Sequence, residues 1–159
     1  MRSLPLLALV LVGCAPQDAL RPGDGVLEVY RAAQLFSPNV AITVLIDERP
    51  AATLDGGTFA RCSLPPGQHQ VRAEPTVSTA VFGLTTAEVV AGPGARIRLA
   101  PGEVLVRRLA VRPGGVGVAT TTSGVAVRYS AAIDTGEDRD PETAGIDRET
   151  ATRQVPCLL

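Results

Sequence analysis

The sequence contains few residues of the kinds that usually carry out acid–base or nucleophilic catalysis. His69 is its single histidine, and lysine is absent, so that every other basic residue is arginine. A histidine base works with a nucleophile and an orienting group, and the segment from Pro66 to Arg72 suggests neither. One histidine is also too few for a His-rich metal site. We therefore interpret His69 as the start of a strand after a Pro-Pro-Gly corner, and we assign no catalytic residue, metal or other cofactor.

Carboxylates are concentrated near the C-terminus, where residues 134–149 include seven acids and two arginines. Four of them fall at positions one, three, five and twelve of an EF-hand register: Asp138, Asp140, Glu142 and Glu149. Thr143 occupies the position that needs glycine, and Pro141 stiffens the loop, so a calcium site is a chance alignment. We interpret this stretch as a solvated charge run. Asp140-Pro141-Glu142 is also typical of a helix start. The sequence therefore allows either a disordered segment or a short helix in this stretch.

The charge of the chain gives no general attraction for nucleic acid, because the formal net charge of its 159 residues is −1. No glycine-rich or Walker phosphate-binding sequence is present. Arg107, Arg108 and Arg112 are candidates for a local site that binds an anion. Neighbouring residues of a strand point to opposite faces, so at most one arginine of the doublet can join a given site.

Short strands separated by glycine and proline turns are the elements that must position these residues. Such strands, recurring about every 8–12 residues, predict a β-sandwich or barrel, and we expect an all-β, antiparallel sandwich. Ile42, Val44 and Ile46 alternate with Thr43, and Ile97 and Leu99 alternate with Arg96 and Arg98; Val125, Val127 and Tyr129 form a third alternating set. The expected strands are Val26–Arg31, Ala41–Ile46, Phe59–Leu64, His69–Ala73, Thr76–Phe82, Thr86–Val90, Arg96–Leu99, Glu103–Val111, Val116–Thr121 and Val125–Ser130.

The N-terminal residues contain a further cysteine with a characteristic setting. Leu11-Val12-Gly13-Cys14 closes an apolar run that follows Arg2, and it resembles the lipobox of bacterial lipoprotein precursors. The resemblance implies that Cys14 receives lipid and becomes the first residue of the mature protein. The run is shorter than the roughly 20 residues of a membrane-spanning helix, and secretion after ordinary cleavage at Ala15 remains the alternative. Because Ala15 replaces the aspartate that often signals inner-membrane retention, we expect the periplasmic leaflet of the outer membrane.

Cys62 and Cys157 remain once Cys14 is lipidated. An envelope location makes a disulfide between them reasonable, whereas in the cytosol they would be free or bound to metal. Cys62 is also compatible with a buried free thiol. Cys157 lies in an apolar C-terminal end, which we expect to dock on the sandwich and to be secured by a bond to Cys62.

The middle of the chain contains a set of strand and turn motifs: Val29-Tyr30-Arg31, residues 42–50, Gly57 and residues 64–71, which include a Leu-Pro-Pro-Gly-x-His corner. This set resembles the PEGA-like β-sandwich of small bacterial lipoproteins of unknown function. Glu48 departs from the pattern, because the turn normally has a glycine that reaches positive φ at low cost. We therefore expect a longer hairpin or one of another type. The resemblance covers a third of the chain and implies a fold, with no catalytic residues.

The resulting organisation is a signal peptide (1–13), a flexible tether (14–25), a β-sandwich (26–133) and an acidic segment whose apolar end docks back (134–159). We expect a non-catalytic binding or structural module of the cell envelope, attached to the membrane by lipid on Cys14. Its partner would be a protein or an envelope polymer. The alternatives are an envelope hydrolase that uses carboxylates and a surface-exposed, adhesion-type lipoprotein.

Overall fold

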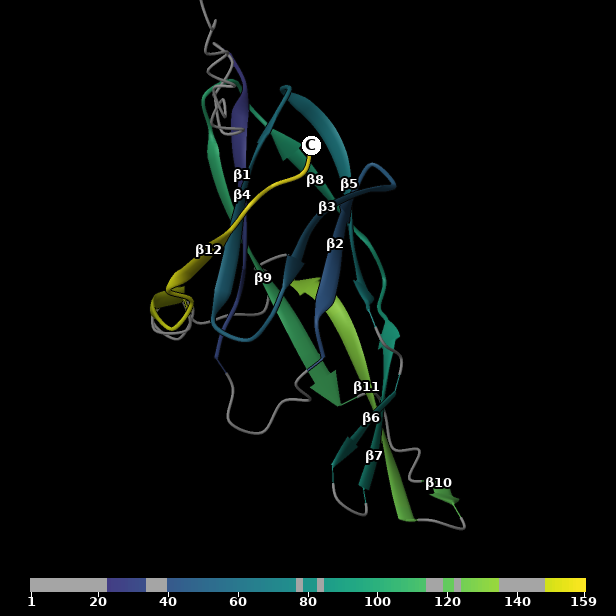
Figure 1. Ribbon diagram of the computed structural model, residues 1–159. Helices are drawn as coiled ribbons and strands as arrows, with labels where there is room; N and C mark the ends of the chain where they lie inside the picture. The colour runs from purple at the N-terminus through teal and green to yellow at the C-terminus, as the bar shows by residue number, and fades with distance from the viewer. Residues whose placement is uncertain are drawn as a thin grey trace, which may run out of the picture.

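The computed structural model describes residues 23–33, 40–76, 79–82, 85–113, 119–121, 124–134 and 148–159. These residues are almost entirely β-structure, arranged as two sheets in two layers (Figure 1). The strands are β1 (Gly25–Arg31), β2 (Ile42–Ile46), β3 (Arg49–Leu54), β4 (Thr58–Leu64), β5 (Gly67–Pro75), β6 (Thr79–Phe82), β7 (Thr85–Ala91), β8 (Ala95–Leu99), β9 (Val104–Pro113), β10 (Ala119–Thr121), β11 (Gly124–Asp134) and β12 (Arg153–Val155).

The larger sheet has the strand order β12-β4-β1-β9-β11-β7-β6, with β10 paired to β11, and the smaller sheet has the order β3-β2-β5-β8. Every pair in the small sheet is antiparallel, as predicted. The large sheet contains three parallel pairs that the sequence did not predict: β1 with β9, β7 with β11, and β4 with β12. These partners are distant in the sequence, and strand periodicity carries no information on which distant strands pair.

The core lies between the two sheets and is built from the alternating positions that the sequence indicated. Ile42, Val44 and Ile46 are each no more than 2% exposed, and Thr43 points away from them. In β8, Ala95, Ile97 and Leu99 are buried whereas Arg96 and Arg98, which alternate with them, are exposed. Burial of one such aliphatic side chain contributes about 1.5–3 kcal/mol, so these alternating residues hold the layers together. Residues 125–128 lie outside the described side chains.

The hairpin between β2 and β3 corrects one expectation. Asp47 and Glu48 have φ values of 50° and 63°, so two residues with positive φ connect the strands, as in a type I′ turn. The turn is therefore neither longer nor of another type, contrary to the expectation based on Glu48, and β3 is a strand that the sequence analysis missed. Contacts of the side chains explain how the turn forms without glycine: Asp47 accepts a hydrogen bond from the Gln70 amide, and Glu48 pairs with Arg72.

Other differences concern strand ends and the C-terminus. The strand expected at Thr76–Phe82 is described from Thr79, and β5 continues to Pro75. The strand expected at Val116–Thr121 is described from Ala119. Strand β12 was not expected. The helix start at Asp140, the calcium register at Asp138, Asp140 and Glu142, and the lipidation site Cys14 all lie outside the described residues.

Candidate functional surfaces

The disulfide between Cys62 and Cys157 is present, as predicted, and it fastens the C-terminal segment. The two Cα atoms are 5.4 Å apart, and the cysteines have a sequence separation of 95. Strand β12 pairs with β4 beside this bond, and the Leu158 amide donates a 2.8 Å hydrogen bond to the Ala51 carbonyl of β3. Leu158 and Leu159 themselves are 61% and 42% exposed. Strand pairing and the disulfide therefore attach the end of the chain to the large sheet, and the Leu158 hydrogen bond attaches it to the small sheet.

His69 has the orienting carboxylate that a catalytic base needs, but its second ring nitrogen is also occupied within the protein. Its Nδ1 lies 2.7 Å from a carboxylate oxygen of Asp47, and its Nε2 lies 2.8 Å from the Pro65 carbonyl oxygen. Both oxygens can only accept, so both ring nitrogens donate and the ring is an imidazolium in this arrangement. No ring nitrogen is left to take a proton from a substrate. The residue instead ties the β2–β3 turn to the β4–β5 turn.

The surroundings of this pair shift both titrations. Burial alone would lower the pKa of His69, but the hydrogen bonds to Asp47 and to the Pro65 carbonyl outweigh it and raise that pKa above the usual 6.5. Burial would likewise raise the pKa of Asp47, but hydrogen bonds from His69 and from the Gln70 amide lower it below the usual 3.8. Each partner stabilises the charged form of the other.

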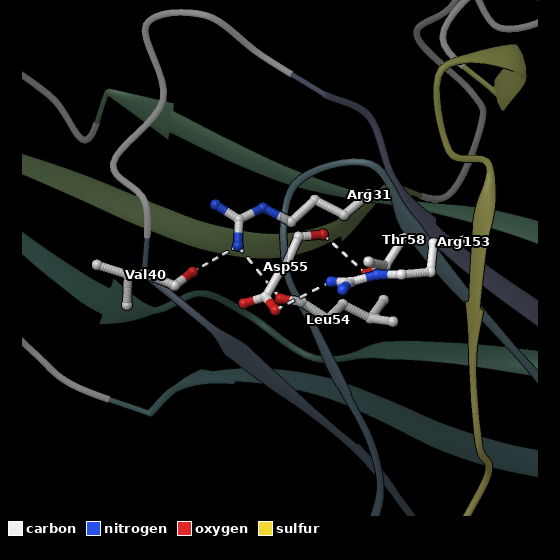
Figure 2. A network of polar contacts seen from close by, with 6 residues as sticks. All are labelled: Arg31, Val40, Leu54, Asp55, Thr58 and Arg153. Carbon is white, nitrogen blue, oxygen red and sulfur yellow. Dashed lines mark hydrogen bonds and ion pairs between the residues drawn. The ribbon is translucent and has the colours of Figure 1, made fainter.

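A buried arginine forms the polar network at the β3–β4 turn. Figure 2 shows the Arg31 guanidinium, whose Nη1 donates to the Val40 carbonyl and, over 3.2 Å, to the Leu54 carbonyl. Burial lowers the pKa of Arg31, and the nearby charge of Asp55 opposes that shift. The Asp55 carbonyl accepts a 2.8 Å hydrogen bond from the Thr58 hydroxyl, which closes the turn. Sequence reasoning missed this residue, although the alternation Leu27, Val29, Arg31 places it on the inward face.

Glu28 is a buried carboxylate on the outer face of the large sheet. It is 7% exposed and pairs with Arg148 and, at 3.6 Å, with Arg61. The Arg148 guanidinium also lies over the Phe59 ring, 4.4 Å from its centroid, and 5.9 Å from that of Tyr30. These contacts neutralise the acid and place a cation against aromatic faces. The cluster attaches the start of the described C-terminal segment to β1 and β4.

Arg107 and Arg108 lie on opposite faces of β9, as the sequence predicted. Arg107 and Arg108 pair with Val29 and Tyr30 of β1, which lie on opposite faces of the large sheet. Arg112 forms a 3.0 Å ion pair with Asp134 at a shallow pocket of about 270 Å³. Pro93, Gly94, Ala95, Ala110, Ala132 and Ile133 form the rest of its wall. The ion pair neutralises the one arginine of this pocket, so the pocket has little attraction for an anion.

The outer face of the small sheet, called here the polar face, differs from the clusters of paired charges described above because it includes arginines without an acidic partner in the described residues. It presents alternate residues of all four strands: Thr43, Thr53, Gln68, Gln70, Arg72, Glu74, Arg96 and Arg98. Arg72 pairs with Glu48 at 3.1 Å and with Glu74 at 3.2 Å. Arg96 and Arg98 are exposed, and neither has an acidic partner within the described part of the chain. Their cross-strand neighbours are Gln70 and Gln68.

Metal-binding and membrane-spanning features were also considered in the described ranges. Within them, no group of three or more histidine, cysteine, aspartate or glutamate side chains is arranged to hold a metal ion. No helix among the same residues has the length and apolar character needed to cross a membrane. No protein-family model matches the chain, and no curated protein matches it.

Proposed function

We propose that the chain is a lipid-anchored cell-envelope protein, a non-catalytic binding or structural module that faces the periplasm. The Cys62–Cys157 disulfide is the observation that carries this proposal. Disulfides persist in oxidising compartments and are rare in the cytosol. An exported protein with a cysteine placed as in Leu11-Val12-Gly13-Cys14 is then anchored through that cysteine. Stable attachment takes two or more acyl chains, which lipoprotein modification supplies.

A PEGA-like or Ig-like sandwich is the fold that we propose within this two-layer architecture. The β2–β3 hairpin and the corner between β4 and β5, with Pro65-Pro66-Gly67, support it because they fall where the resemblance places a tight turn and a Pro-Pro-Gly corner. Sandwich domains of this kind present sheet faces, edges and loops to partners, which fits a binding module.

A non-catalytic role is supported by how the ionisable groups are used. His69 donates from both ring nitrogens, Glu28 is neutralised by arginines, and Cys62 is oxidised in the disulfide. A nucleophile or general base must instead have a free atom within reach of the substrate. These groups act as fasteners between strands, so we expect any partner to be bound without chemical change.

The experiment that tests the anchor is mass spectrometry of the protein from the membrane fraction. We expect an N-terminal Cys14 with a diacylglyceryl group, and recovery in outer-membrane fractions of a density gradient. Cys14→Ala should leave the precursor unprocessed or release the domain to the soluble fraction, while Cys62→Ala with Cys157→Ala should leave the lipid in place. A mature N-terminus after Ala15 without lipid would show that the anchor is wrong. Protease treatment of intact cells separates the periplasmic leaflet from surface display.

A further inference from the structure

We infer that the free edge of β8 binds an extended acidic polypeptide, which adds as a fifth strand to the small sheet. This inference rests on the proposed binding function and names the class of partner. The acidic strand would place carboxylates opposite Arg96 and Arg98 while its backbone pairs with β8.

The backbone of β8 supplies the first observation. Within the described ranges, β8 is the last strand of the small sheet and pairs with β5 alone, along Gly67–Val71. In an antiparallel pair, alternate residues direct their N–H and C=O groups away from the partner strand. No described residue satisfies those outward groups, which belong to Arg96 and Arg98, through a backbone hydrogen bond. Such a row of unpaired groups is the template on which another chain can add.

The start of the large sheet limits how much of this edge can accept a strand. Gly25 of β1 lies so close to Leu99 that a Cβ on Gly25 would be 2.6 Å from the Leu99 side chain. The β1 segment therefore occupies the space next to the end of β8. The usable edge runs from Ala95 to Arg98, so the added strand is short.

Charge decides the chemistry of the occupant. Arg96 and Arg98 lie two residues apart in a strand, which separates them by about 6.6–6.8 Å along the edge. An added strand repeats its own side chains on one face at the same interval, so acids at alternate positions match both arginines. Arg72 does not compete for the acidic side chains of the added strand, because Glu48 and Glu74 already neutralise Arg72. Gln68 and Gln70 beside the arginines add neutral donors and acceptors.

Peptide binding to the full-length, oxidised protein tests the inference. The probe is a fluorescein-labelled peptide, Thr-Glu-Val-Glu-Thr-Glu-Thr, and the readout is its anisotropy at low salt. We expect saturable binding that weakens roughly tenfold in Arg96→Gln with Arg98→Gln, the effect of losing two exposed ion pairs. Arg49→Gln removes one positive charge from the opposite edge and should leave binding unchanged, whereas Arg96→Gln alone removes one from this edge and should weaken binding. Circular dichroism checks that each variant keeps its strands.

Backbone methylation of the peptide separates strand addition from simple charge attraction. Methylating the alternate peptide nitrogens that face β8 should abolish binding, whereas methylating the other set should preserve it. If neither set matters, and polygalacturonate competes as well as the peptide does, the polar face attracts polyanions and strand addition is wrong. Unchanged binding by the double arginine variant would also overturn the inference. The assay needs no lipid, so a failure at Cys14 would leave its result intact.

Discussion

The two edges of the small sheet are β3 and β8, and the chain finishes them differently. At β3, Pro50 removes a backbone donor, a register shift lies opposite it between Val44 and Leu45, and Leu158 bonds the Ala51 carbonyl. At β8, the described chain leaves Ala95–Arg98 without such cover, and Arg96 and Arg98 are exposed instead. Proline, bulges, covering segments and charges are all ways to prevent uncontrolled pairing at an edge. A covering segment blocks the edge strand from pairing with any other chain. Charged side chains at the edge only restrict which chains can pair with it, by their charge.

This comparison gives different roles to the two halves of the sheet. The β3 side is fastened by the disulfide, by Arg31 and by the tight turn, so changes there should alter stability. The β8 side contributes its buried Ile97 and Leu99 to the core, but its exposed arginines contribute little to stability. The following predictions test this division in order of decreasing effect.

Removing the disulfide should have the largest effect. Cys62→Ala with Cys157→Ala should lower the free energy of unfolding by roughly 2–5 kcal/mol, because the bond restrains a long loop in the unfolded chain. Urea denaturation measures the change, and amide exchange should show that Leu158 loses protection while Ile97 keeps it. Leu158→Ala, which removes an exposed side chain, is the matched control and should change stability little. Equal stability of the oxidised and reduced protein would contradict the assigned role.

Replacing Arg31, the buried arginine at the end of β1, should have the second-largest effect on the free energy of unfolding. Arg31→Met keeps most of the side-chain length but leaves the Val40 and Leu54 carbonyls without this donor. We expect a loss of about 2–3 kcal/mol, the cost of unsatisfied buried acceptors. Arg153→Gln is the control, since its pair with Asp55 spans 3.5 Å between exposed side chains and should be worth under about 0.5 kcal/mol. Similar losses in the two variants would show that Arg31 is not a fastener.

The His69–Asp47 pair should make stability depend on pH. Because the folded pKa of His69 is raised, its contribution is complete below the unfolded value of 6.5 and is lost as pH rises through the folded pKa. Because the folded pKa of Asp47 is lowered, its contribution is present above 3.8 and is lost as pH falls through the folded pKa. The pair is therefore strongest between these values.

Urea denaturation across the pH range tests this pair. Asp47 is half exposed, so solvent screens the interaction and we expect no more than about 1 kcal/mol. His69→Gln should remove the decline in stability on the alkaline side, and Asp47→Asn should remove the decline on the acid side. A constant difference between the protein and His69→Gln from pH 5.5 to 8.5 would refute the linkage.

The turn before β3 should give the smallest effect. Glu48 has a φ of 63°, a conformation that costs a non-glycine residue about 1 kcal/mol or more. Glu48→Gly relieves that cost. It also loses the exposed ion pair with Arg72 and raises the entropy of the unfolded chain, and both of these effects destabilise the fold. We expect a net stabilisation of about 0.5 kcal/mol. Glu48→Gln keeps the backbone cost and removes only the charge, and it should be slightly less stable than the parent protein. A ranking with the glycine variant below the glutamine variant would contradict this account.

The sequence by itself determined most strands and which of their faces is buried. Alternation in β2 and β8 predicted both the core residues and the outward direction of Arg96 and Arg98, because side chains of a strand point to opposite faces in turn. Cysteine pairing also followed from the sequence, once Cys14 was set aside for lipid. These features depend on the order of residue types along a short segment or on the number of cysteines in the chain.

Only the tertiary structure decided how the strands are joined and which edge stays open. β3 escaped prediction because Ala51 and Ala52 are both buried in it, which interrupts the alternation, and because it contains Pro50. The conformation of Glu48, the carbonyls that Arg31 binds and the parallel partners of β1, β4 and β11 depend on residues far away in the sequence. The absence of an acidic partner for Arg96 and Arg98 in the described chain is likewise set by packing, since pairing of charges requires proximity in space.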